Sequence, residues 1–545
     1  MDRATTAAAP DGKAVTISIS CRVCPGRESE FAALLPDITT ALLRFPGCLD
    51  VRLVPPARRN RDYRLVVRFA RESDLRSWEA SEAWQSLRAR LDTLIERALD
   101  IVDITGTSQE RRLSSTLTPL DRFVRTSISG IGLLLAGTIL AVVAANSPLS
   151  GVYTHVWETE LTIGLEGFGI TESLRHWVND GLMTLFFFLL GLEIKREVLV
   201  GELRHPRQAA LPIAAAMGGA IVPALIYAGV NWGGEGFRGW GIPMATDAAF
   251  SLGILTLLGS RVRPVLLVFL TALAIVDDIL AVLIIALFYT ETISWLALGV
   301  AVALLGALSG ANAVGIHRWP LYAVLGVGVW VAVFASGVHG TIAGVLVAMT
   351  VPARSWINPS EFLVRGQKAL DDFRAACFVT PSMLSNQPQQ HATETLEQLC
   401  KEVETPLTHF EHQLNPWIAY AILPLFAFAN AGVPLGSGFS QLLANPVTWG
   451  VVVGLVLGKP LGITLFSWLA VRLGVALLPS TISWRQIVGV AWLGGIGFTI
   501  SLFVAELAFG TDPLGDAARV GILVGSVVAG TIGYVILRAT LPPSQ

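Results

Sequence analysis

Charged residues and cysteine are the two things this sequence has little of. Only 15% of its 545 residues are Asp, Glu, Lys or Arg, whereas a soluble globular chain carries roughly 25%. The five cysteines do not indicate a disulfide framework. A net charge of −2 with no dominant basic run argues against nucleic acid as a partner. The composition therefore excludes a wholly soluble enzyme, a disordered chain and a secreted disulfide scaffold.

The charged residues that are present are unevenly distributed. The first 112 residues hold 34 of them, and the remaining 433 hold only 46. This contrast indicates a small soluble domain joined to a long apolar one. Residues 1–13 lack the apolar core of a signal peptide, so we expect a flexible amino terminus and a soluble domain that stays in the cytoplasm.

The apolar part is predicted to cross a membrane about twelve times. A spanning helix needs about 20 mostly apolar residues, and the candidates are 127–145, 177–194, 209–230, 243–258, 264–288, 293–311, 321–335, 338–352, 416–434, 448–470, 488–508 and 519–538. With both termini inside, 17 Lys and Arg residues fall in inner segments and 3 in outer ones, as the positive-inside rule requires. The longest inner loop, 353–412, is expected to be polar and to end in a short helix over 394–412.

Five charged residues lie where the predicted spans leave little access to water: Asp180, Asp247, Asp277, Asp278 and Lys459. A charge at the centre of a span costs about 2.5–3.5 kcal/mol on the insertion scale and marks an ion or proton pathway. Neighbouring helix positions point about 100° apart, so Asp277 and Asp278 can face a cavity and a helix respectively, or the reverse. Thr246 adds a hydroxyl oxygen, and hard cations prefer oxygen ligands. Lys459 is the natural partner for one aspartate.

Two of the predicted spans look interrupted. Pro243–Asp247 breaks the fourth, and Gly494–Thr499 breaks the eleventh, where Gly495, Gly497 and Thr499 would supply unwound backbone. Irregular backbone at membrane depth is tolerated only where it lines a cavity or is buried in protein. Paired interruptions in two halves of a chain are typical of an inverted-repeat transporter. Spans three to five would then correspond to spans ten to twelve.

Eight strings in the apolar part resemble those of NhaA-type sodium/proton antiporters, in family order over about residues 115–540. They are Trp177–Asp180, Phe188–Glu197, Ala245–Phe250, Ala272–Asp278, Ser336–His339, Pro424–Gly432, Gly458–Gly462 and Gly495–Thr499. The resemblance implies a secondary active transporter rather than an enzyme. It would expel sodium or lithium from a bacterial cell across the inner membrane, with more protons than cations moved per cycle. It also implies no cofactor, a lipid environment and a homodimer.

The same resemblance implies roles for individual residues. Asp277 and Asp278 would bind the transported sodium and the protons, and Lys459 would pair with Asp277. Thr246 and Asp247 would lie where two unwound chains cross, and Asp247 and Lys459 would balance the helix-end dipoles. Asp180 would lie on the cation access path. The positions linked to pH control are Glu193, Arg196, Glu197, Glu411, His412 and His339.

Two qualifications accompany these roles. The family often has a second histidine where this chain has Asn415, which argues against the usual pH set-point. Glu193, Arg196 and Glu197 are spaced i, i+3 and i+4, so an ordinary ion cluster at a helix end remains an alternative.

The soluble part is predicted to be an α+β domain over 14–105. Alternating apolar residues predict a strand at 15–21, then a helix at 27–45, strands at 48–54 and 62–69, a helix at 74–98 capped by Ser73, and a strand at 99–105. This βαββαβ order is ferredoxin-like. The stretches Phe45–Val51, Arg64–Phe69 and Ser81–Trp84 resemble antibiotic-biosynthesis-monooxygenase-like domains. A linker at 106–118 would join this domain to the antiporter domain at 119–540.

The soluble domain lacks a recognisable catalytic set. The first histidine of the chain is His155, and no motif of paired acids precedes it. A regulatory or dimerising accessory is therefore the favoured interpretation. Two alternatives remain open: an ion-coupled solute symporter on the same scaffold, and a membrane-anchored monooxygenase acting on a small aromatic molecule.

Overall fold

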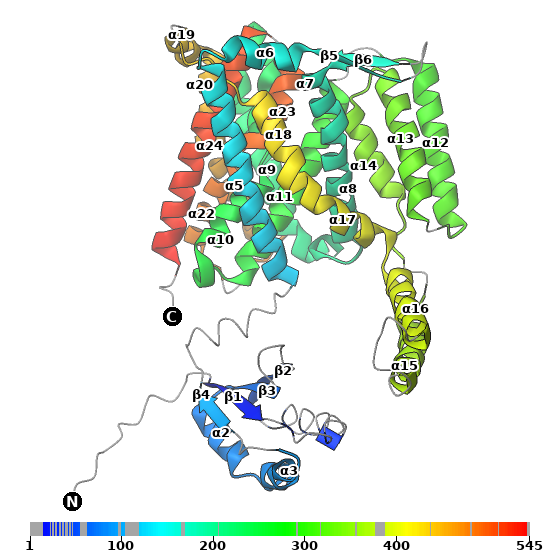
Figure 1. Ribbon diagram of the computed structural model, residues 1–545. Helices are drawn as coiled ribbons and strands as arrows, with labels where there is room; N and C mark the ends of the chain where they lie inside the picture. Colours follow the sequence, from blue (N-terminus) through cyan, green and yellow to red (C-terminus); the bar gives the residue numbers. More distant parts are fainter. Residues whose placement is uncertain are drawn as a thin grey trace, which may run out of the picture. The chain divides into compact units, whose positions relative to one another are not determined.

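The computed structural model divides into two compact units, Met1–Arg122 and Phe123–Gln545, each of which is described by itself (Figure 1). The predicted flexible amino terminus, the linker at 106–118 and most of the predicted helix at 27–45 lie outside the described residues. Residues 15–103 are described with gaps at 22, 24–26, 28–29, 32–33, 35–37, 39–41, 43–44, 46, 55–62 and 96–99, and residues 119–541 with gaps at 165–168, 205, 290–292, 317, 355–356, 377–386, 437, 480–481 and 511.

The first unit is built on a four-stranded antiparallel sheet. Its order is β2 (Cys48–Val54), β3 (Tyr63–Phe69), β1 (Val15–Cys21) and β4 (Asp100–Asp103). The first strand therefore lies between the third and the fourth, which is the ferredoxin-like arrangement expected from the strand order. Alternate residues such as Ile17 and Ile19 are buried, because side chains alternate between the two faces of a strand.

The single helix predicted at 74–98 is wrong, because the structure has two helices there. They are α2 (Glu72–Glu79) and α3 (Glu82–Asp92). The Ser81 side chain accepts a hydrogen bond from the Trp84 backbone N–H at 3.2 Å and so begins the second helix. Ser73 lies within α2 rather than at its cap. An apolar stripe continues across both helices, which is why the sequence pattern did not reveal the break.

The second unit is mostly helical. Before the first interruption it contains α5 (Pro119–Ala145), α6 (Ser150–Glu158), a hairpin of β5 (Glu160–Ile163) and β6 (Ile170–Ser173), α7 (Leu174–His176), α8 (Met183–Leu199) and α9 (Pro206–Val230). After it come α11 (Pro264–Phe288), α12 (Trp295–Ala313), α13 (Trp319–Ala335), α14 (Gly340–Thr350), α18 (Leu423–Asn430), α19 (Phe439–Ala444), α20 (Pro446–Val453), α21 (Lys459–Arg472) and α24 (Pro513–Thr540).

Several of these helices are long and apolar enough to cross a membrane. Among the described residues there are five such helices, and up to seven if each of two bent pairs forms one span. The five are Ala209–Val230, Pro264–Phe288, Trp295–Ala313, Pro446–Arg472 and Pro513–Thr540. This unit is therefore a membrane-embedded helical bundle.

The prediction of a polar loop over 353–412 with one terminal helix is wrong. This segment contains α15 (Pro359–Ala376) and α16 (Gln387–Val403), which pack against each other (Figure 1), and the start of α17 (Pro406–Trp417). Both α15 and α16 are amphipathic and bury small or apolar residues such as Ala369 and Leu399. Their many charged residues lower the average hydropathy, which obscured the helical period.

Three π-helical turns occur among the described residues of this unit. These turns are Trp177–Leu182 before α8, Ile418–Ile422 between α17 and α18, and Gly454–Gly458 between α20 and α21. The first contains Asp180, and the third ends immediately before Lys459. Such turns inside α-helices occur frequently at functional sites, and here two of them flank charged residues.

Candidate ion-binding site

The two interrupted spans meet at their interruptions. The segment predicted as the fourth span is divided into a 3₁₀ segment, η3 (Glu235–Met244), and α10 (Ala248–Leu257). The eleventh is divided into α22 (Trp484–Gly494) and α23 (Phe498–Phe509), with a bend of 43°. The Asp247 backbone N–H donates to the Ile496 carbonyl at 2.6 Å, so the two unwound chains touch. Four half-helices therefore end or begin at one place inside the bundle.

Asp247 caps two of these half-helices at once. Its carboxylate accepts hydrogen bonds from the Phe250 N–H at 3.1 Å, the Thr499 N–H at 3.0 Å and the Thr499 hydroxyl at 2.6 Å. Its exposed fraction is only 2%. A negative charge is favourable at a helix N-terminus, and Asp247 lies at the N-termini of both α10 and α23.

Lys459 provides the complementary positive charge. It is completely buried, and its ammonium group donates to the Thr246 hydroxyl and to Oδ2 of Asp277. The Thr246 hydroxyl in turn donates to the Gly494 carbonyl at 2.8 Å, at the C-terminal end of α22. Lys459 thus lies near the negative end of a half-helix and forms an ion pair with one of the two neighbouring aspartates.

The other aspartate faces a cavity. Asp277 and Asp278 are consecutive on α11, and both are buried. Oδ1 of each accepts no hydrogen bond in the described part of the chain. Only Asp278 lines the cavity of about 160 Å³ that also reaches Asp247 and Thr499. The neighbouring positions therefore do face different surroundings, one a lysine and the other an open space.

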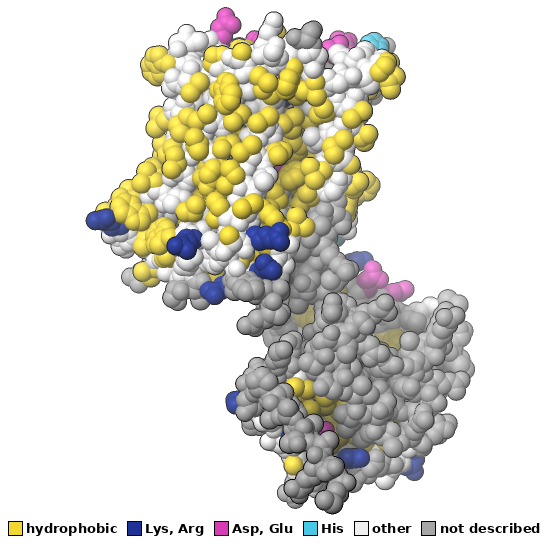
Figure 2. Space-filling view, turned by 90° about the vertical axis from the view of Figure 1, so that its left-hand side faces the viewer, with side chains coloured by type: hydrophobic (Ala, Val, Ile, Leu, Met, Phe, Trp, Pro, Cys, Tyr) yellow, Lys and Arg dark blue, Asp and Glu magenta, His cyan; other side chains and the backbone are white. Residues whose placement is uncertain are grey.

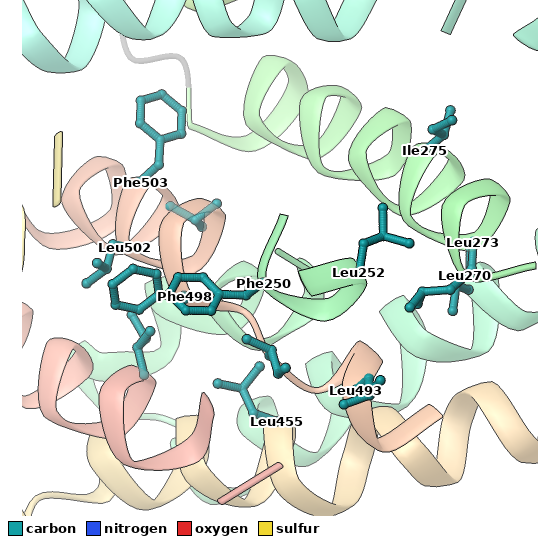
Figure 3. Packing of buried hydrophobic residues seen from close by; sticks show 14 of the residues in the cluster. Phe250, Leu252, Leu270, Leu273, Ile275, Leu455, Leu493, Phe498, Leu502 and Phe503 are labelled. Atoms are coloured by element: carbon teal, nitrogen blue, oxygen red, sulfur yellow. The ribbon is translucent and has the colours of Figure 1, made fainter. Parts of the chain in front are cut away.

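Close packing holds the crossing together. The rings of Phe250 and Phe498, which come from α10 and α23, lie edge to face with centroids 5.0 Å apart (Figure 3). Leu455 and Leu493 belong to the same buried hydrophobic cluster (Figure 3). A Cβ added to Gly495 would lie 2.5 Å from the Leu455 carbonyl oxygen, so only glycine allows this approach of two chains.

The predicted pH-control residues are brought together only in part. Glu193 and Arg196 line the same cavity as Asp278, and Arg196 forms an ion pair of 3.0 Å with the buried Glu411. His412 is on the adjacent position of α17, but its side chain is 75% exposed and its Nδ1 lies 3.4 Å from Glu404. Glu197 lies on α8, one helical turn after Glu193. Asn415 lines the cavity.

Two other predicted residues lie elsewhere. His339 caps α14, and its Nε2 is 2.8 Å from the Tyr289 carbonyl oxygen, at the C-terminal end of α11. Asp180 is buried, and its Oδ2 is 2.9 Å from Nε2 of His176. Neither residue lines the cavity that holds Asp278.

Sequence reasoning missed two sets of buried polar residues. Asn179, next to Asp180, exchanges hydrogen bonds of 2.7 and 3.2 Å with Asn430 of α18. Ser251 and Ser501 donate hydrogen bonds across the crossing. The signal for the serines was available, since each lies four residues after an interruption. The asparagine pair joins residues 251 positions apart, and such a distant pairing leaves no local pattern.

Comparison with known proteins shows the family of the membrane-embedded unit. Residues 121–537 match the family model described as Na+/H+ antiporter 1. The chain belongs to this family. A relative named Na(+)/H(+) antiporter NhaA from Koribacter versatilis (strain Ellin345) is 49% identical over 431 residues, covering 79% of this chain and 93% of the relative. Na(+)/H(+) antiporter NhaA 2 from Syntrophotalea carbinolica is 46% identical over 427 residues, covering 78% and 97%.

The two parts of the chain thus match two different protein families. The membrane-embedded unit makes this protein a sodium/proton antiporter, a secondary transporter and not an enzyme. Residues 14–90 match the antibiotic biosynthesis monooxygenase family model. In the described part of the chain no group of three His, Cys, Asp or Glu residues could hold a metal ion. Sodium is the transported substrate rather than a resident cofactor.

Proposed function

We propose that exchange takes place at Asp278, assisted by Asp277 and Lys459. The observation that carries this proposal is the contrast between Asp278 and the charges around it. Asp247 and Lys459 are engaged by fixed partners, whereas Asp278 is a buried carboxylate that faces a cavity with one oxygen unpartnered. Such a carboxylate can accept either a proton or a hard cation, but a bound proton removes the charge that attracts the cation.

Two neighbouring carboxylates also support electrogenic exchange. Sodium or lithium arriving through the cavity would meet Asp278 first, and its charge would compete with Lys459 for Asp277. Two carboxylates can together release more than one proton for each monovalent cation that binds. The crossing would supply fixed charges on both sides of the site, through Asp247 at the helix N-termini and Lys459 at a C-terminus.

We also propose that the bundle has twelve spans with both termini in the cytoplasm of a bacterial cell. Lys and Arg side chains gather at one end of an apolar band on the helical unit, and Asp and Glu at the other (Figure 2). The positive-inside rule assigns the basic end to the cytoplasm. The two interrupted spans would be the central members of inverted repeats formed by spans three to five and ten to twelve.

Control by pH is proposed for the cytoplasmic mouth of the cavity. Glu193 and Arg196 line it, and the ion pair between Arg196 and Glu411 joins α8 to α17. Protonation of either glutamate would change the charge next to the route to Asp278. The proposed contributors at a greater distance are Glu197, His412 and His339, while Asp180 is proposed for cation access from the other side.

The amino-terminal unit is proposed to be an accessory domain over residues 14–105. It forms its own sheet and core, and no residue of the proposed transport site precedes Asp180. It would regulate transport or stabilise a homodimer of the antiporter. The two rival functions find no specific support in the geometry of the described residues.

The test uses carboxylate-to-amide substitutions in vesicles. We expect Asp278→Asn and Asp277→Asn to abolish sodium-driven proton flux while the proteins remain folded, because an amide can neither release a proton nor supply negative charge. The matched control is Asp516→Asn, which removes a carboxylate that pairs with Arg519 outside the crossing. Near-normal flux in both aspartate variants, measured without any organic solute, would overturn the site assignment.

A further inference from the structure

Two serines occupy equivalent places after the two interruptions. Ser251 of α10 is four residues after Asp247, and Ser501 of α23 is four residues after Gly497. Both have an exposed fraction of 0%. Their backbone N–H groups donate to the carbonyls of Asp247 and Gly497 in the ordinary helical manner. The side chains therefore have equivalent starting points on two half-helices that begin at the crossing.

Each serine hydroxyl reaches the other interrupted span. Ser251 Oγ donates to the Leu493 carbonyl at 2.8 Å, at the end of α22. Ser501 Oγ donates to the Ile242 carbonyl at 2.7 Å, near the end of η3. The half-helix that follows one interruption thus holds the half-helix that precedes the other, in both directions.

These contacts provide hydrogen-bond donors for carbonyl groups near the ends of two half-helices. The last carbonyls of a helix have no intrahelical partner, and no water in the bilayer core can replace one. A serine inside a helix commonly bonds a carbonyl of its own helix instead, yet both of these hydroxyls bond across the crossing. A Cβ added to Gly497 would lie 2.1 Å from Ser501 Oγ, so the glycine provides the space for this hydroxyl.

The serines are also connected to the cavity that contains Asp278. Ser251 follows Phe250, whose backbone N–H donates to Asp247. Ser501 is two residues after Thr499, whose N–H and hydroxyl donate to the same carboxylate. Asp247 and Thr499 line the cavity together with Asp278. A shift of either half-helix would therefore move the wall opposite the ion-binding carboxylate.

We propose that Ser251 and Ser501 are positioning residues, a reciprocal serine clamp that sets the spacing of the crossing and thereby the affinity of the site for sodium. The Leu493 carbonyl also accepts the Ile496 backbone N–H at 3.1 Å, so the Ser251 hydroxyl adds a second bond at this helix end. This inference rests on the ion site proposed above.

The experiment compares Ser251→Ala, Ser501→Ala and the double variant with Ser467→Ala. Ser467 is equally buried on α21, but its hydroxyl has no hydrogen-bond partner in the described part of the chain. We expect each clamp variant to raise the apparent KM for sodium about three- to tenfold, the effect of one lost hydrogen bond, with a maximal rate within about twofold of the parent. Ser467→Ala should leave both quantities unchanged.

Further variants separate the possible outcomes. Ser251→Cys and Ser501→Cys keep a weak donor of similar size, so we expect their KM to lie between the parent and the alanine variants. KM values equal to those of Ser467→Ala, or a loss of thermal stability with unchanged KM, would overturn the clamp. Should the alanine variants fail to insert, the cysteine variants decide, and a parental KM in both refutes the proposal.

Asp278→Asn is measured in the same vesicles. If it abolishes exchange while the serine variants behave as Ser467→Ala, only the clamp is refuted. If it retains exchange, the proposed ion site itself is wrong, whatever the serines do.

Discussion

The crossing and the proposed cytoplasmic mouth of the cavity both contain charged residues, but the two regions differ in how far these residues are exposed. At the crossing, Lys459 and Asp247 are almost fully buried and have short contacts to fixed partners. At the mouth, the Arg196 side chain is 47% exposed and that of His412 is 75% exposed. Water reaches Arg196 and His412, although Glu411 is buried, whereas Lys459 and Asp247 depend on their protein partners. This difference in burial fits the proposal that the crossing binds the ion and that the mouth responds to pH.

The largest expected effect is on stability and separates the two regions directly. We predict that Lys459→Ala lowers stability by about 3–5 kcal/mol, because it leaves the buried Asp277 carboxylate without its partner. Arg196→Ala should cost less than Lys459→Ala, because the Arg196 side chain is 47% exposed, although its partner Glu411 is buried. The measurement is the thermal unfolding midpoint of both purified variants.

A double variant tests the cause. Adding Asp277→Asn to Lys459→Ala should recover part of the lost stability, since no uncompensated charge then remains. Equal midpoints for Lys459→Ala and Arg196→Ala would show that burial does not distinguish the two regions.

The next effect concerns the pH profile of transport. We predict that Asn415→His steepens the activity profile between about pH 6 and 7, because an imidazole titrates there and an amide does not. Position 415 lines the same cavity as Arg196, whereas His412 is mostly exposed and its Nδ1 lies 3.4 Å from Glu404. His412→Ala should therefore shift the midpoint of the activity profile only slightly.

Sodium-dependent proton flux against pH, for the parent and both variants in identical vesicles, measures this. Three superimposable profiles would place pH sensing at the aspartates of the crossing instead of at the mouth.

The smallest expected effect on transport comes from removing the amino-terminal unit. Deletion of residues 1–105 should leave the maximal exchange rate nearly unchanged while altering regulation or oligomer stability. The reason is that every residue of the crossing and of the mouth lies in the second unit. Flux and oligomeric size of the truncated and full-length proteins are compared. A truncated protein that inserts normally but exchanges no sodium at any pH would make this domain part of the transport machinery.

Prediction from sequence succeeded where a local pattern has a single physical cause. Charges within apolar stretches are costly, so Asp277, Asp278 and Lys459 were identifiable without a structure. The strands of the amino-terminal sheet were predicted from alternating residues, and their order in the sheet from the ferredoxin-like βαββαβ pattern. The pattern failed at 353–412, because charged amphipathic helices resemble a polar loop in average composition. It also failed between α2 and α3, where one capping serine interrupts a continuous apolar stripe.

The sequence by itself determined the class of this protein, because membrane burial makes each unusual residue stand out against an apolar background. It also indicated two interruptions and the residues around them. Only the tertiary structure decided that these interruptions touch through Asp247 and Ile496, that Asp278 rather than Asp277 faces the cavity, and that His412 does not. The reason is that a hydrogen bond or a shared cavity depends on how helices that are distant in the sequence pack against each other. A local sequence pattern does not specify the rotation of one such helix relative to another.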